Sequence, residues 1–300
     1  MRFSLSSTNS NLPPLQKPVD QYSLKAILCS TLLRIYDSYH RLFPGVGGDA
    51  TLLKTQYIPW KTFALDERAK ANTGIVLEIF QLYEQLMRDD TSDSLVLWHQ
   101  MGILLTTDCR LLEEAAGREG TEAAENAILK IKIWAQTSAA RRACLHAAQS
   151  FKIVSQRRTL DDGSFHSPHH LFNAALVLGF YLLIAPPVIK RRQVMGGKEL
   201  ELLGDVDWKL IGDEGLVKVS ETQATEKIEN KHVAFIRFGG PMSLGNEPCL
   251  GGVRSAQKTL LDFAGLLDNM KKWKMGDYSR LLYEMSGNLG HLHVIVGESS

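Results

Sequence analysis

Three aspartates stand close together in a polar stretch, in the order Asp89-Asp90-Thr91-Ser92-Asp93. Carboxylates at this spacing can bind magnesium and a prenyl diphosphate when they project into a shared cavity. That chemistry also needs a second ligand set and basic residues for the leaving group, and the expected ligands do not follow downstream. The sequence therefore favours a turn whose Asp and Ser side chains cap the next helix, with magnesium binding by Asp89, Asp90 and Asp93 as the alternative.

Histidines are concentrated around Pro168, at positions His166, His169 and His170. A zinc site would need further ligands, but no cysteine lies nearby and adjacent histidine side chains diverge on a helix. Polar contacts at the start of a helix are therefore expected for His170 and its neighbours.

Cys144 and His146 have the residue types of a nucleophile and its base, but no orienting partner accompanies them. A packed thiol is the favoured role of Cys144.

The glycine-rich runs at 45–48 and 239–240 lack the preceding strand and the following Lys-Ser/Thr of a phosphate-binding loop. The sequence therefore predicts no catalytic group, no metal ligand set and no cofactor.

Two basic clusters could contact phosphate or direct nuclear import: Lys190-Arg191-Arg192, and the lysines within 271–274. Runs of this length are also common on solvated faces. Since the whole chain has a formal charge of only +1, nucleic-acid binding would require such a local patch.

Arg141 and Arg142 lie in an otherwise apolar, alanine-rich stretch. A guanidinium in such a helix needs a buried partner or a route to solvent. Carboxylates from another helix are the expected partners.

The elements that must position these residues are predicted from apolar side chains at three- and four-residue steps. A break near Thr137-Ser138 is expected because an uninterrupted helix to Ser155 would be unusually long. Ser167-Pro168 marks a helix start, which leads into a core helix that ends before Pro186. The predicted helices span about 24–43, 75–86, 95–116, 121–136, 138–155, 168–185, 260–270 and 278–289.

Between 190 and 252 the composition changes to glycine, charge and short apolar runs. The sequence predicts a loop-rich insertion here, and only His232–Phe238 suggests a strand. Insertions of this length are uncommon inside a compact domain and indicate a functional surface.

With 44% hydrophobic and 22% charged residues, the composition is that of a soluble globular protein. Together with the helical periodicity, this predicts an all-α, multi-helix globular bundle. We expect an irregular lead-in at 1–20 and a single helical domain at 21–295.

The four cysteines are widely spaced, which favours reduced thiols and an intracellular location. No secretory signal is expected at the start, and the apolar run at 171–185 is too short for a membrane span.

Several segments, in order, resemble a known family. Trp134 precedes the run Ala140-Arg141-Arg142-Ala143 and then His146, and a spacer leads to Pro168 and the Ala-Ala-Leu core at 174–176. The stretch from 97 to 117 and the closing helices at 255–285 continue the likeness. This chain thus resembles the regulatory (middle homology) domain of fungal transcription factors, in the version found downstream of zinc fingers.

The resemblance implies an all-helical, non-catalytic regulatory module in the nucleus, with the cytoplasm as the alternative. Its expected partners are other transcription regulators, a small-molecule effector or a second copy of the chain, and control of fungal secondary metabolism is one expected role. A zinc-dependent DNA reader is not predicted, because the sequence has no closely spaced cysteines and no combined Cys/His ligand set. The residues expected to serve structure or interaction are Trp134, Arg141, Arg142, His146 and His170.

Overall fold

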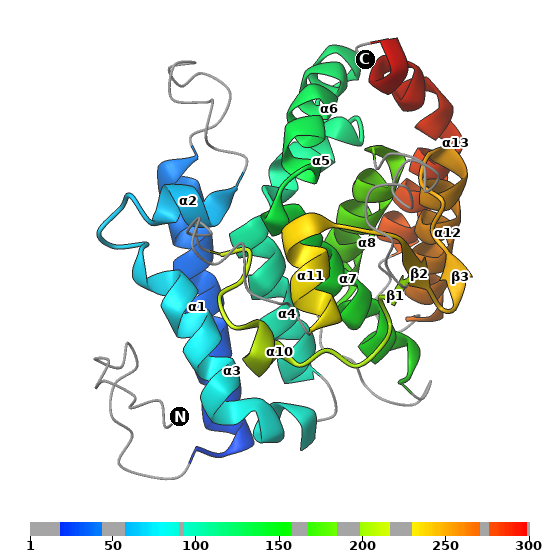
Figure 1. Ribbon diagram of the computed structural model, residues 1–300. Coiled ribbons are helices and arrows are strands. Elements are labelled where there is room, and N and C mark those ends of the chain that lie inside the picture. The colour runs from blue at the N-terminus through cyan, green and yellow to red at the C-terminus, as the bar shows by residue number, and fades with distance from the viewer. Residues whose placement is uncertain are drawn as a thin grey trace.

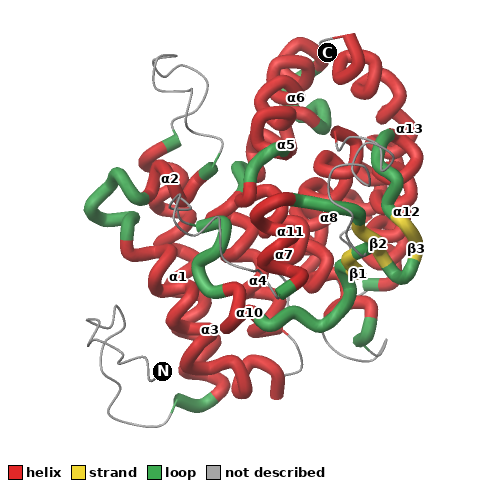
Figure 2. Tube along the Cα trace, in the orientation of Figure 1, coloured by secondary structure: helices red, strands yellow, loops and turns green. Residues whose placement is uncertain are grey.

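The protein folds into a bundle of helices, drawn in Figure 1 and coloured by secondary structure in Figure 2. The computed structural model describes residues 19–43, 58–89, 93–157, 167–184, 199–216, 230–270 and 276–298. Helices make up 76% and strands 3% of the structure. The fold class predicted from the sequence, an all-α multi-helix globular fold, is therefore confirmed.

Within the described ranges, helices follow one another from residue 21 to residue 298, and the strands lie between residues 200 and 248. The helices are α1 (Gln21–Leu42), α2 (Pro59–Phe63), α3 (Ala71–Asp89), α4 (Asp93–Thr106), α5 (Cys109–Ala115), α6 (Thr121–Ala135), α7 (Ser138–Ser155), α8 (Ser167–Ile184), α10 (Trp208–Ile211), α11 (Lys231–Phe238), α12 (Val253–Asn269) and α13 (Gly276–Glu298). The strands are β1 (Leu200–Glu201), β2 (Met242–Leu244) and β3 (Glu247–Pro248).

Helices α4, α7 and α8 form the centre of the bundle, where they pack on one another. Helix α8 is apolar on all sides, as expected of a helix surrounded by others. By length and composition alone it could also cross a membrane, but 94% of it is buried inside the protein. Its burial confirms the prediction of a core helix.

The remaining helices cover this centre from different sides (Figure 1). Helices α1 and α3 pack on α4, while α12 and α13 pack on α8 and on each other. Helix α5 packs on both α6 and α8. Helix α7, besides packing on α4 and α8, also contacts α11.

The predicted break at residues 137–138 is confirmed, because α6 ends at Ala135 and α7 begins at Ser138. The Thr137 hydroxyl caps α7 by accepting a hydrogen bond from the backbone N–H of Ala140 at 3.1 Å. A side chain that satisfies a free N–H group is what starts a new helix at this point.

The single helix predicted from residue 95 to 116 is wrong, since the chain breaks between α4 and α5 at Thr107 and Asp108. Asp108 caps α5, and two distant side chains satisfy carbonyls near the end of α4. Trp134 Nε1 donates to the carbonyl of Thr106 at 2.9 Å, and the Tyr39 hydroxyl lies 2.6 Å from the carbonyl of Thr107. These tertiary bonds replace those that a continuous helix would have made.

The loop-rich region predicted at 190–252 contains short regular elements where it is described. We call residues 199–216 and 230–252 the excursion. Strand β2 pairs parallel to β1 and antiparallel to β3, which forms a small sheet. The strand suggested at 232–238 is wrong, because these residues form helix α11, capped by the Asn230 side chain and ended by Gly239 at φ 76°.

Candidate functional site

Helix α7 holds the excursion against the bundle through side chains that donate to backbone carbonyls. Arg141 donates from Nε to the carbonyl of Ile236 at 2.7 Å and from Nη2 to that of Arg237 at 2.8 Å. Both carbonyls belong to the last turn of α11, where a helix presents unsatisfied acceptors and a partial negative charge. The Arg141 guanidinium therefore fixes the end of α11 on α7.

Arg142 makes the corresponding contact with the turn after α10. Its Nη1 donates to the carbonyls of Gly212 at 2.9 Å and Glu214 at 2.7 Å. The residue is only 1% exposed, and burial lowers the pKa of its guanidinium to about 9. The guanidinium carbon also lies 5.6 Å from the ring centroid of Trp208, within the range of a cation–π contact.

The partners expected for these arginines, carboxylates on another helix, are therefore wrong. Arg141 and Arg142 bind main-chain carbonyls of the excursion. The nearby carboxylate of Glu214 is engaged by Arg237, whose Nη2 lies 2.6 Å from Glu214 Oε2. Because carbonyls are present in any sequence, this contact depends on the path of the excursion backbone more than on its side chains.

Gln149 and Lys152 extend the contact along α7. Gln149 Nε2 donates to the carbonyls of Leu202 at 2.9 Å and Gly204 at 2.8 Å, and Lys152 pairs with Asp205 at 2.7 Å. We call Arg141, Arg142, Gln149 and Lys152 the α7 anchor.

Beside the anchor, two buried histidines from different helices share a hydrogen bond. His99 Nδ1 on α4 lies 3.0 Å from His146 Nδ1 on α7, so one ring must donate and the other accept. The Trp208 ring of the excursion stacks on His146, with centroids 4.0 Å apart and planes 16° apart. Trp98 contacts the edges of both histidine rings. The excursion thus covers the histidine pair with an aromatic side chain.

Both histidines are neutral in the folded protein. Burial lowers the pKa of His99 to about 3. Burial also holds the pKa of His146 well below its ordinary value, and the adjacent His99 and Arg142 act in the same direction. His146 Nε2 is buried and has no hydrogen-bond partner among the residues that the structure describes. The pair therefore links α4 to α7 without carrying charge.

Gly102 provides the space for the His146 ring. A Cβ placed on Gly102 would lie 2.5 Å from His146 Cε1 and Nε2, closer than non-bonded atoms approach. We expect Gly102→Ala to destabilise the protein by about 1–3 kcal/mol, because the ring must move or leave its stack with Trp208. Chemical denaturation measures this loss.

Gly265→Ala is the matched control, because a Cβ at this helical position on α12 meets no atom within 4 Å. This change should be neutral or slightly stabilising. Equal stability of the two alanine variants would contradict the packing role of Gly102.

The other predicted interaction residues lie away from the anchor. Trp134 on α6 donates to the carbonyl of Thr106, and His170 is buried in the first turn of α8 beside His169. Cys144 is a buried free thiol, as predicted. The structure therefore brings Arg141, Arg142 and His146 together at the excursion and leaves Trp134 and His170 in other parts of the core.

The aspartates of the magnesium alternative are engaged by protein side chains where they are described. Asp89 accepts a hydrogen bond from Gln85 Nε2 at 2.8 Å, and Asp93 pairs with Arg157 Nη2 at 2.9 Å. Asp90 lies outside the described residues. Within the described ranges, no group of three or more His, Cys, Asp or Glu side chains is placed to hold a metal ion.

The residues of the two basic clusters, Lys190, Arg191, Arg192 and the lysines within 271–274, lie outside the described residues. His166 and the lead-in up to residue 18 do so as well.

Four contributors to the site were not identified as site residues from the sequence: His99, Gln149, Lys152 and Trp208. His99 stands in the stretch from 97 to 117 that continues the family likeness, so its position in the sequence was a usable signal. Trp208 follows Asp207, which caps the short helix α10, but nothing local indicates that the ring stacks on a histidine of α7.

Comparison of the chain with known protein families, characterised proteins and solved structures finds no match in any of the three.

Proposed function

We propose that this chain is a non-catalytic regulatory module of the kind found in fungal transcription factors. It acts in the nucleus through contacts with other transcription regulators or with a small-molecule effector, and control of secondary metabolism is its proposed setting. The observation that carries the proposal is the α7 anchor, in which Arg141 and Arg142 bind carbonyls of the excursion. These arginines, with His146, belong to the segment that resembles the family.

The proposed regulation requires this contact to exist in two states, docked and released. The anchor side chains bind the excursion through discrete hydrogen bonds to its backbone, and Trp208 covers the histidine pair. A partner or effector that binds better to the docked or to the released excursion would shift the equilibrium by its difference in affinity. A change in one surface segment would then alter which protein surface is available to a partner.

A reporter assay tests this proposal. The chain is inserted between a heterologous DNA-binding domain and an activation domain, and reporter output is compared with that of a fusion carrying an inert folded protein. We expect insertion to change output several-fold, because a coupling free energy of about 1–3 kcal/mol corresponds to 5–150-fold. Arg141→Gln should alter that change, since it releases the end of α11.

Arg280→Gln is the matched control, because Arg280 is an exposed α13 residue whose ion pairs with described residues are long, at 3.8 and 3.9 Å, and stay on its own helix. It should leave reporter output unchanged. Output that is the same for the chain and for the inert protein would reject the regulatory role. Magnesium-dependent release of diphosphate from a prenyl diphosphate, abolished by Asp93→Asn, would support the enzymatic alternative in its place.

A further inference from the structure

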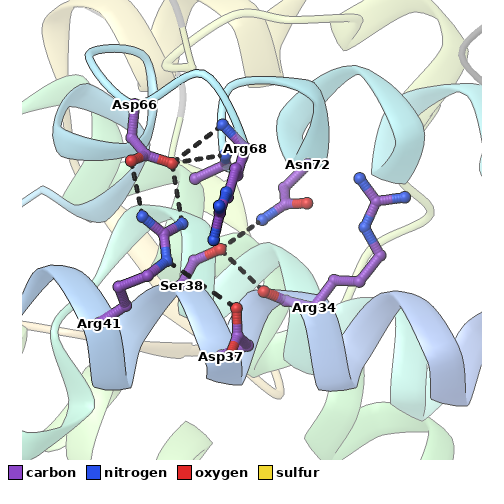
Figure 3. A network of polar contacts seen from close by, with 8 residues as sticks. Arg34, Asp37, Ser38, Arg41, Asp66, Arg68 and Asn72 are labelled. Carbon is purple, nitrogen blue, oxygen red and sulfur yellow. Dashed lines mark hydrogen bonds and ion pairs between the residues drawn. The ribbon is translucent and has the colours of Figure 1, made fainter.

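A groove lies between α1 and the turn that precedes α3 (Figure 3). Its volume is about 460 Å³, within the range of sites for small molecules. It is lined by Leu33, Arg34, Asp37, Ser38 and Arg41 of α1 and by Arg68 of the turn. The groove lies outside residues 95–289, which carry the family resemblance, and its function is independent of the one proposed above.

One wall of the groove is held in place by a two-point ion pair. Arg41 donates from Nη1 and Nη2 to the two carboxylate oxygens of Asp66, at 2.6 and 2.8 Å. Asp66 Oδ1 also accepts hydrogen bonds from the backbone N–H groups of Arg68 and Ala69, at 3.0 and 2.9 Å. These bonds and the Arg41 guanidinium hold the pKa of Asp66 well below its usual range. The backbone that carries Arg68 is therefore fixed relative to α1.

The floor is formed by a short chain of hydrogen bonds. Asn72 Nδ2 donates to Ser38 Oγ at 3.0 Å, and Ser38 Oγ donates to the carbonyl of Arg34 at 2.8 Å. Asn72 is buried, and its Oδ1 has no partner among the described residues. This network joins α3 to α1 directly beneath the groove.

Two guanidinium groups of the groove have no carboxylate partner in the part of the chain that the structure describes. Arg41 is occupied by Asp66, but the Arg34 and Arg68 side chains make no hydrogen bond or ion pair with any residue that the structure describes. In Figure 3, Arg68 points toward Ser38 and Arg34 rises from α1 on the other side of Asn72. The two groups thus border the same groove from different elements.

The charge of these groups defines the ligand that fits. Two free guanidinium groups are matched by one doubly charged oxyanion, and a phosphate monoester carries a charge of about −1.5 to −2 at pH 7. Guanidinium groups bind phosphate oxygens through paired, charge-assisted hydrogen bonds. The Asp37 side chain, 78% exposed, can accept a hydrogen bond from a ligand hydroxyl, while Leu33 offers apolar contact.

We propose that this groove binds the phosphoryl group of a small phosphomonoester between Arg34 and Arg68. Binding joins α1 to the turn at 64–70 and so stabilises the packing of α1 against α3.

Isothermal titration calorimetry of the full chain with AMP tests the proposal, with inorganic phosphate as the minimal probe and adenosine as the uncharged one. AMP and phosphate should bind saturably, and adenosine should not. Arg34→Gln and Arg68→Gln should each weaken AMP binding about tenfold or more, because each removes a charge-assisted contact. Asp37→Asn should strengthen binding, because it removes a negative charge beside the phosphoryl group.

Arg280→Gln is again the matched control, since it removes the same charge from an exposed position on α13. Because Arg34 and Arg68 are exposed, all of these variants should fold with nearly unchanged stability. Absence of saturable AMP binding, or equal affinity of the wild-type chain and the Arg34 and Arg68 variants, would overturn the proposal.

Discussion

Replacing Arg142 with alanine is expected to lower the free energy of unfolding by about 3–5 kcal/mol, among the largest effects of a single substitution. The change removes the donor for two backbone carbonyls, those of Gly212 and Glu214. A buried polar group left without its partner costs about 1–3 kcal/mol, and the lost contact with Trp208 adds to this. Urea denaturation measures the loss.

Two comparison variants separate the anchor contact from a general effect of removing an arginine. Arg142→Lys keeps a charged donor but not the planar guanidinium, so an intermediate loss is expected. Arg254→Ala, at an exposed position on α12, should change stability by less than about 0.5 kcal/mol. Equal stability of Arg142→Ala and the wild-type protein would show that Arg142 does not hold the excursion.

The helical framework could be predicted from the sequence because its signals are local. Apolar side chains at three- and four-residue steps marked α1, α3 and α12, and the polar pair Thr137-Ser138 marked the start of α7. In each case the residues that determine the element are its own neighbours in sequence. Local signals were therefore sufficient for the fold class.

The incorrect predictions came from interactions between distant residues. The division of the 95–116 stretch depends on Trp134 and Tyr39, whose side chains satisfy carbonyls near the end of α4. Residues 232–238 contain a short apolar run of the kind found in strands, but Asn230 caps them as a helix, and Arg141 binds the carbonyls at its other end. Tertiary hydrogen bonds thus overrode the local pattern.

The candidate site could be predicted only in part, for the same reason. The sequence indicated that Arg141 and Arg142 need buried partners, but not that these partners are backbone carbonyls 95 and 70 residues away. A main-chain acceptor has no signature in the residue type. His146 was identified as an interaction residue, but its partner His99 lies 47 residues earlier and on another helix.

The histidine pair should make the protein less stable in mild acid. Both histidines have a pKa lowered by burial, whereas in the unfolded chain each titrates near 6.5. Their stabilising contribution is therefore complete above pH 6.5 and is lost as pH falls below it, because the unfolded chain binds protons that the folded protein excludes. At pH 5, which is still above the pKa of about 3 of the folded-state His99, that histidine should cost about 2 kcal/mol, and His146 adds a loss of the same sign.

Urea denaturation between pH 7.5 and about pH 5 measures this loss above the range in which most unfolded carboxylates titrate. Burial also lowers the pKa of His232, which adds a smaller loss of stability in acid. Burial raises the pKa of Asp108, which stabilises the folded protein as pH falls and so opposes this loss. His99→Gln removes one of the two buried histidines and should roughly halve the slope of stability against pH. His40→Gln is the control, because His40 lies at an exposed position on α1 and its replacement should leave this slope unchanged. The same slope in the wild-type protein and in both variants would mean that the His99–His146 contact is protonated or open to solvent in the folded state. Trp208 would then not cover a neutral pair.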